Sequence, residues 1–402
     1  MWPFLFCDLA PPPDVYVDEP ALPGERAAQP TPAPAAPEPV SRRQAPWLDE
    51  LGHRVDLYGR FAGHLAFTSD GVDVANNGSR FGIKAEQKLS VDVSVIGQGE
   101  WRVNLGQGDT SYSISENPDT GLATLDSTTS DAIGTRLGFL GVRFGPYGTL
   151  TYGKQWGVYY DVSEWTDRYA VFGAHGSSTY NAGTDGGQTG EGRANDAVIY
   201  RVELGPVRLG AQAQFLDTRD GVVDGVSGSL VYDSGQGLKV GLAYSHAFLD
   251  FGELDVVGYD GGDAQALTGG INFDDGAWMI SALDTWTRNH EFVLADSATV
   301  AYDTLGAELL AGYRFRGKLM VYAGFDFAIP RNLDTTFVDP EYGTRDVLGG
   351  VRWLFDPKPG SFVYLEGRTG QTRDASGVRA ADVVTLGIRF NYSLRRALGF
   401  DS

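Results

Sequence analysis

Side chains of opposite character alternate along many short segments of this chain, and this period of two constrains the fold more than any other feature. In 55–67 the odd positions carry apolar side chains or glycine, whereas the even positions include Arg60 and His64. The segments 207–215 and 319–327 alternate in the same way. Successive side chains of a β-strand point to opposite faces, so each segment is predicted to be a strand with one apolar face.

Short and long connections alternate between these segments. The turn Gly145-Pro-Tyr147 is short, whereas 106–133 and 156–192 are long, and the last of these is a Gly-rich excursion of nearly forty residues. Short turns at one end and long loops at the other are typical of an up-and-down barrel in an outer membrane. We identify sixteen strand segments: 55–67, 79–89, 92–105, 134–144, 148–155, 193–204, 207–217, 226–234, 238–248, 264–273, 277–287, 301–315, 319–329, 345–355, 361–370 and 381–393.

The predicted fold is therefore all-β: a transmembrane antiparallel β-barrel of about sixteen strands, with the third long loop folded inward. Loops as long as 156–192 are uncommon inside compact domains and are usually functional or disordered. We expect this one to enter the mouth of the barrel and narrow it.

Proline marks the domain boundary. Twelve of the nineteen prolines fall within residues 1–46, and proline is excluded from paired strands. We expect 1–46 to be a disordered Pro/Ala-rich extension or linker, 47–393 to be the barrel, and 394–402 to be a tail. No signal peptide is recognisable at the given N-terminus, because the apolar stretch before Cys7 is short and lacks basic residues.

Several function classes are disfavoured. The formal net charge of -20 argues against nucleic acid as a partner, and a single cysteine forms no disulfide framework. The five histidines are scattered, and the sequence contains no Gly-x-Ser-x-Gly, P-loop or His-Glu-x-x-His motif. We therefore expect no enzyme activity and no cofactor, and we read His64 as a wall residue rather than a base.

Calcium is a weaker alternative. The acid pairs Asp220 with Asp224 and Asp260 with Asp263 could hold Ca²⁺ through their oxygens. Solvated loop acids are the favoured interpretation of both pairs.

A set of short motifs in a fixed order gives the chain a family resemblance between about Val55 and Tyr392. From these motifs the sequence resembles the general (non-specific) trimeric porins of Gram-negative bacteria. The motifs are Val55-Asp-Leu-Tyr-Gly-Arg60, Ser79-Arg-Phe-Gly-Ile-Lys84, Gly99-Glu-Trp101, Thr135-Arg-Leu-Gly-Phe139, Tyr152-Gly-Lys154, Tyr159-Tyr-Asp161, Thr166-Asp167, Phe172-Gly173, Gly192-Arg193, Tyr200-Arg201 and Gly387-Ile-Arg-Phe-Asn-Tyr392.

The resemblance implies a homotrimer in the cell outer membrane, in contact with lipid and lipopolysaccharide, that passes small hydrophilic solutes and ions passively. It also implies a constriction in which basic wall residues face acids on the inward loop. Carried over by motif, the predicted constriction residues are Arg60, Arg80, Arg102, Arg136, Asp167, Arg168 and Arg193.

The predicted constriction is more positive than one in which basic wall residues face an equal number of loop acids. Val171 stands where the family has a second loop acid, Arg168 lies beside Asp167, and Arg102 occupies a place where a glutamate can occur. Alternation turns Arg60 and its counterparts away from lipid, where a cation would cost about 2–4 kcal/mol. Weak anion preference is our hypothesis; the alternative is that these arginines only solvate a wet lumen.

Two other functions stay open at this point. One is a substrate-specific channel for phosphate or a sugar, for which Tyr58, Tyr322 and Tyr364 could be parts of an aromatic track. The other is a barrel-anchored binding or adhesion protein whose long loops recognise a ligand.

Overall fold

The fold was obtained as a computed structural model. It describes residues 54–69, 71–104, 113–116, 123–126, 133–173, 175–179, 189–216, 223–248, 256–295, 298–356 and 360–397. The chain divides into two compact units, Met1–Pro46 and Trp47–Ser402. The first unit lies outside the described residues, so the predicted linker stays a prediction.

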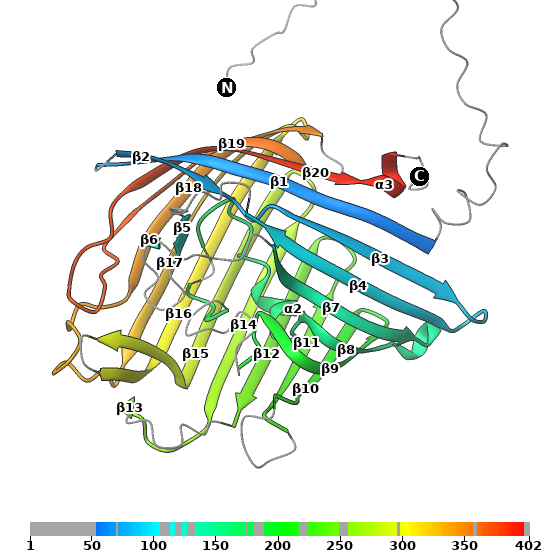
Figure 1. The fold of residues 1–402 in the computed structure, drawn as a ribbon, viewed down its shortest axis with the longest axis horizontal. Coiled ribbons are helices and arrows are strands. Elements are labelled where there is room, and N and C mark those ends of the chain that lie inside the picture. Colours follow the sequence, from blue (N-terminus) through cyan, green and yellow to red (C-terminus); the bar gives the residue numbers. More distant parts are fainter. Residues whose placement is uncertain are drawn as a thin grey trace, which may run out of the picture. The chain divides into compact units, whose positions relative to one another are not determined.

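Sixteen antiparallel strands close into a barrel, as predicted, and β1 pairs with β20 to complete it (Figure 1). The junction runs from Tyr58 opposite Ser393 to Phe67 opposite Val384. The barrel strands are β1 (Val55–Thr68), β3 (Arg80–Lys88), β4 (Ser94–Val103), β7 (Ile133–Arg143), β8 (Thr149–Trp156), β9 (Arg193–Leu204), β10 (Val207–Gln214), β11 (Gly225–Asp233), β12 (Leu238–Ala247), β14 (Ala264–Asp274), β15 (Trp278–Ala295), β16 (Ala298–Phe315), β17 (Leu319–Arg331), β18 (Thr344–Asp356), β19 (Ser361–Gly370) and β20 (Val383–Ser393).

The alternation seen in the sequence sets the two faces of the wall. In β1 the apolar Leu57 and Phe61 are exposed on the outside, whereas His64 and Ala66 are buried on the inside. The same apolar and polar alternation predicts a lipid-facing outer surface around a polar interior. The aromatic side chains of Tyr152 and Trp353 are also exposed.

Smaller elements complete the fold, several of them within segments predicted as loops. Strand β2 (Gly71–Asn76) pairs with the second half of β1, and β13 (Val256–Val257) pairs in parallel with β16. The others are β5 (Ser113–Glu116), β6 (Ala123–Asp126), a 3-10 turn at Gly145–Tyr147, α2 (Tyr160–Ser163) and α3 (Leu394–Ala397). None of the helices in the described ranges has the length and hydropathy to span a membrane.

Some connections between the predicted strands contain strand of their own. Residues 68–78 contain β2, and 288–300 are mostly strand, because β15 extends to Ala295 and β16 begins at Ala298. A β-bulge between Thr287 and Glu291 interrupts the period of two there, so the sequence pattern is lost although the pairing continues.

Of the inward loop, the structure describes 157–173, 175–179 and 189–192, and these parts enter the barrel as predicted (Figure 1). Its first part packs Tyr159, Val162 and Trp165 against the inner faces of four strands through Val231, Ala243, Ala266 and Leu283. These contacts bury a large apolar surface, which holds the loop against β11, β12, β14 and β15 rather than in the centre of the channel.

Candidate pore constriction

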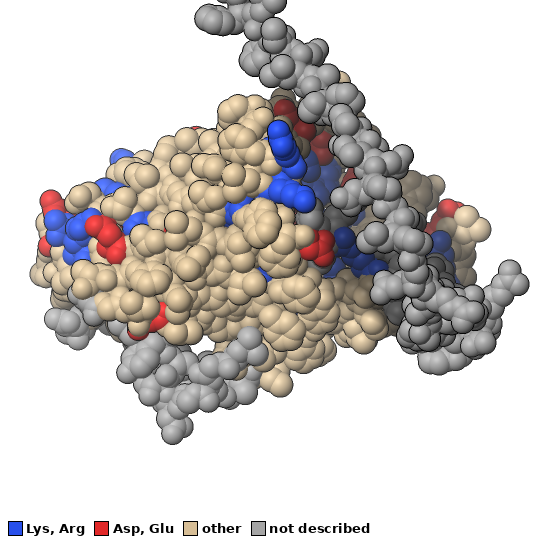
Figure 2. Space-filling view, turned by 90° about the horizontal axis from the view of Figure 1, so that it is seen from above, with Lys and Arg blue, Asp and Glu red and all other residues tan. Residues whose placement is uncertain are grey.

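Three of the predicted arginines form a row across neighbouring strands. Arg60 of β1 lies opposite Arg80 of β3, and Arg80 lies opposite Arg102 of β4. Directly opposed residues of an antiparallel pair share one face of the sheet, so the register alone places all three side chains on the same face. In the view of Figure 2, Lys and Arg side chains gather where the surface is hollowed, with Asp and Glu beside them.

Arg136 of β7 joins this row through a glutamate that the sequence argument left out. Its Nε lies 2.9 Å from Oε1 of Glu100, and Nε of Arg80 lies 3.6 Å from Oε2 of the same carboxylate. Tyr58 donates a third contact from its hydroxyl, at 3.0 Å. An acid is thus present two residues before Arg102 on the same face, and its charge offsets part of the positive charge of the row.

A fifth arginine, Arg389 of β20, was missed. The positive charges of Arg389, Arg80 and Arg136 all act on Arg60, whose own Nε donates to the neutral Oδ1 of Asn391 at 3.0 Å. Arg389 alternates with the outward-facing Ile388 and Phe390, so the test that selected Arg60 would also have found it. The name basic wall is used below for Arg60, Arg80, Arg102, Arg136 and Arg389.

The predicted Arg193 stands beside the basic wall, at the start of β9. Its guanidinium carbon lies 5.9 Å from the centre of the Trp156 ring, which in turn stacks on Tyr160. Lys154 of β8 feels the charges of Arg193, Arg102 and Arg136 and is a further cation that the predicted set lacked. It was visible in the motif Tyr152-Gly-Lys154.

The two loop residues in the predicted set, Asp167 and Arg168, contact different parts of the structure. Asp167 accepts a hydrogen bond of 2.6 Å from the hydroxyl of Tyr160. Arg168 extends away from the basic wall to Asp274 at the end of β14, with 3.3 Å between Nη1 and Oδ2. Because Asp274 also pairs with Arg314, Arg168 belongs to a separate group of charges.

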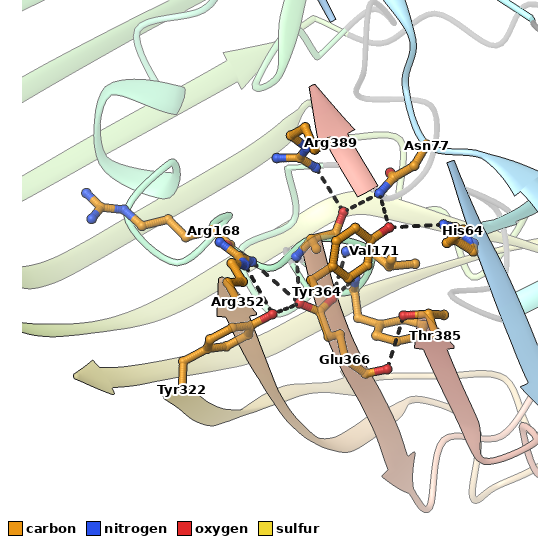
Figure 3. Close-up of polar contacts among 12 residues, drawn as sticks. His64, Asn77, Arg168, Val171, Tyr322, Arg352, Tyr364, Glu366, Thr385 and Arg389 are labelled. Carbon is orange, nitrogen blue, oxygen red and sulfur yellow. Dashed lines mark hydrogen bonds and ion pairs between the residues drawn. The ribbon is translucent and has the colours of Figure 1, made fainter. Parts of the chain in front are cut away.

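Glu366 of β19 anchors the middle of the inward loop (Figure 3). Its carboxylate accepts the backbone N–H groups of Ala170, Val171 and Phe172 at 2.7, 2.7 and 3.1 Å. Arg389 donates to the carbonyl of Ala170 at 3.0 Å. The wall therefore binds the backbone of this segment, and the side chains of Ala170 and Phe172 are buried against the wall as well.

Two more buried carboxylates hold the next part of the loop. Asp326 of β17 accepts the backbone N–H groups of His175 and Gly176 at 2.9 and 2.6 Å. Glu308 of β16 accepts that of Ser177 at 2.6 Å. The sequence signal for these anchors was an acid on the inward face of a strand.

The tyrosines considered for an aromatic track have other partners. Tyr58 contacts Glu100, Tyr322 donates to Glu366, and Tyr364 accepts a hydrogen bond of 2.7 Å from Asn77. His64 lies on the inner wall beside Tyr364, with 3.3 Å between its Nδ1 and the hydroxyl oxygen. These contacts use the polar ends of all three rings for positioning.

The acids considered for calcium binding have partners within the protein, as far as they are described. Asp260 pairs with Arg288 at 2.6 Å, Asp263 with His246 at 3.0 Å, and Asp224 accepts the backbone N–H of Leu216 at 2.6 Å, while Asp220 lies outside the described residues. Across the described ranges, no three His, Cys, Asp or Glu side chains are grouped as a metal ion would require. The absence of a cofactor stays a prediction.

A cavity of about 850 Å³ adjoins the basic wall, and its lining includes Arg80, Glu100, Gln155 and Trp156. Fixed charges of both signs along such a passage create a field that orients dipolar solutes and sets ion preference. A closed barrel with an apolar exterior, a charged interior and a loop folded inward defines a water-filled transmembrane channel.

Comparison with known proteins places this channel in a family. A family model described as Gram-negative porin matches residues 27–339, and the chain belongs to that family. It is 26% identical to outer membrane porin N of Escherichia coli, over 85% of this chain and 93% of the relative. It is 29% identical to outer membrane porin F of Xenorhabdus nematophila, over 85% and 92%.

Solved structures share the fold. Salmonella typhi OmpF in complex with daunomycin superposes with a TM-score of 0.65 at 20% identity, covering 84% of this chain and 97% of that one. An anion-selective porin from Comamonas acidovorans gives 0.61 at 16% identity, covering 84% and 99%. This protein is thus a channel of the outer membrane for passive diffusion of small hydrophilic solutes and ions, and its family consists of channels rather than enzymes.

Proposed function

We propose that the channel is weakly anion-preferring and that its selectivity is set where the inward loop faces the basic wall. The observation that carries the proposal is the row of Arg60, Arg80 and Arg102 on one inner face of the barrel. Arg136 and Arg389 add two charges to this row, and Glu100 removes one. The balance of these groups is positive.

The overall charge of the chain is negative, whereas the basic wall is positive. The distance from a passing ion decides which of these charges sets the ion preference. The formal net charge is -20, which favours cations in the wide parts of the channel. At physiological salt, charges are screened over about 8 Å. An ion passing the basic wall therefore responds to the arginines beside it more than to acids on distant loops.

The assembly that we propose is a homotrimer in contact with outer-membrane lipid and lipopolysaccharide. Support comes from the family and from the large apolar side chains exposed along the barrel exterior, such as Leu140 and Leu242. An exterior of this kind suits both lipid and a second barrel. Native mass spectrometry from mild detergent tests the proposal, because a monomer alone would contradict it.

A channel specific for phosphate is the alternative that the basic wall supports, since arginine binds phosphate oxygens well. An aromatic sugar track is less supported, because Tyr58, Tyr322 and Tyr364 serve as contacts within the wall and loop. A barrel-anchored adhesion protein would use its loops rather than the lumen.

Planar-bilayer recording separates these functions. A general channel gives ohmic current steps that do not saturate as salt rises. A phosphate-specific channel shows current block by millimolar phosphate, and an adhesion anchor conducts no current. We expect ohmic steps with a reversal potential that favours chloride over potassium in a KCl gradient.

A further inference from the structure

A buried histidine lies between two glutamates, and none of the three residues belongs to the basic wall. His290 of β15 is 1% exposed. Its Nε2 lies 3.1 Å from Oε1 of Glu191, and its Nδ1 lies 3.2 Å from Oε1 of Glu291. Glu191 belongs to residues 189–192, the return limb by which the inward loop rejoins the wall. We refer to the three side chains as the clasp.

The clasp favours a cation. A neutral imidazole has one N–H donor and one acceptor nitrogen, whereas the imidazolium is positively charged and donates from both nitrogens. Nδ1 of His290 has hydrogen-bond geometry to Glu291, and Nε2 lies at ion-pair distance from Glu191 without hydrogen-bond geometry, so a positive charge on the ring stabilises both contacts. Breaking such a buried pair by removing one partner leaves a carboxylate without compensation, which is costly.

A β-bulge explains why two successive residues of β15 both reach the interior. The pairing with β16 shifts between Thr287 and Glu291, and Asn289 adopts a left-handed conformation with φ of 49°. The backbone N–H of Asn289 donates to Asp303 at 2.9 Å, which holds the bulge. Bulges re-aim side chains in this way and are common near functional sites.

Two tyrosines complete the titratable surroundings of the clasp. Tyr159, at the start of the inward loop, feels the charges of Glu191 and Glu291, and its hydroxyl donates to the carbonyl of Ser177 at 3.0 Å. Tyr302 of β16 feels the charge of Glu291. The clasp thus lies where the start and the return limb of the loop come together.

We propose that His290 is a positioning residue of the channel: as a buried cation between Glu191 and Glu291, it holds the return limb and keeps the inward loop from moving across the passage. The inference rests on the proposed role of the loop as the constriction. It goes beyond that role because the clasp touches neither the basic wall nor the solute. Loss of the clasp should appear as instability of the open channel, with selectivity unchanged.

Protonation of Glu191 removes its charge, so the clasp should weaken at low pH. Burial opposes ionisation of this carboxyl, but the positive charge of His290 outweighs it and holds its pKa below the ordinary value. A group with a depressed pKa stabilises the folded arrangement above its ordinary pKa, and this contribution is lost as pH falls through the depressed value. The loop should therefore loosen at a pH below the ordinary pKa of a glutamate.

The test is the variant His290→Gln, recorded in planar bilayers between pH 3 and 8. We expect roughly tenfold more closing events per second at neutral pH, the effect of losing one charge-assisted hydrogen bond. We also expect the acid rise in closing to begin at a higher pH, because Glu191 has lost its cation. His246→Gln is the matched control: it removes a more exposed histidine paired with Asp263 and should change neither quantity.

Two results would overturn the proposal. One is a closing rate like that of the unaltered chain; the other is a higher rate with no shift of the acid rise, which would mean that His290 only fills space. If His290→Gln does not assemble, Glu191→Gln, which nearly preserves shape, decides the question. It should abolish the acid rise, and persistence of the rise would refute the clasp. The reversal potential from the same recordings tests anion preference separately.

Discussion

Arg136 and Glu100 face each other across β7 and β4, with 2.9 Å between Nε of the arginine and Oε1 of the glutamate. Glu100 also lies within 3.6 Å of Arg80. One carboxylate thus contacts two of the arginines that line this part of the channel and offsets one of their charges.

The variant Glu100→Gln should strengthen the preference for anions. One unit charge acting through water at about 8 Å is worth roughly 0.5 kcal/mol, which screening at physiological salt reduces to about 0.2 kcal/mol. Because it acts with opposite sign on the two ions, the chloride-to-potassium permeability ratio should rise about twofold. The measurement is the reversal potential in a KCl gradient. Glu86→Gln is the control, because Glu86 pairs with Arg143 and both side chains are largely exposed. An unchanged ratio for Glu100→Gln would remove this carboxylate from the constriction.

Removing Arg60 should have the opposite effect. Its partner Asn391 is neutral, so Arg60→Gln leaves no carboxylate without its ion pair, and the change in selectivity reports the charge alone. We expect the permeability ratio to fall about twofold by the same Coulomb estimate. Arg288→Gln, at an exposed pair with Asp260, should leave the ratio as it was. Equal changes of the permeability ratio in the two variants would show that ion selectivity does not depend on where the arginine lies, which would contradict the role of the basic wall.

The variant Glu366→Gln should loosen the inward loop. The amide of glutamine would turn a donor toward backbone N–H groups that now donate to a carboxylate, and Arg352 would lose its ion-pair partner. Breaking a buried pair costs about 3–5 kcal/mol. Urea titration should show that loss, and liposome swelling should show faster entry of larger sugars. Glu203→Gln, on an exposed strand end, is the control that should alter neither.

Gly306 of β16 has no room for a side chain. A Cβ atom there would overlap the carbonyl oxygen of Gly176 in the inward loop. Gly306→Ala should push the loop away from the wall, at a cost of about 1–3 kcal/mol, and should change the single-channel conductance. Gly228→Ala, where the nearest atom would be 3.8 Å away, should keep the conductance of the unaltered chain. If both variants conduct alike, the loop does not dock at Gly306.

All sixteen barrel strands were predictable because each carries a local signal. Alternation is a property of neighbouring residues, and a strand between lipid and water must display it along its length. The strand β2 carries only a brief alternation of Val72 and Val74 around Asp73, and its ends are Gly71 and Asn76, so it was too short to be told from a loop. The outer part of β15 was missed because the bulge after Thr287 breaks the period.

The site was predictable only in part, because its contacts join distant residues. Alternation placed Arg60, Arg80 and Arg136 on the inner face correctly, yet it cannot show that Glu100 lies between two of them. The anchor Glu366 binds loop residues nearly two hundred positions earlier in the chain. No local pattern encodes that pairing, which depends on how the closed barrel presents its inner wall to the loop.

The reversal potential of the unaltered chain tests the central claim most directly. Purified protein in a planar bilayer, with KCl concentrations differing tenfold between the two sides, should give a potential of the sign expected for chloride as the more permeant ion. The preference should weaken in Arg60→Gln and strengthen in Glu100→Gln. A clear potassium preference in the unaltered chain would contradict the claim that the basic wall governs passage.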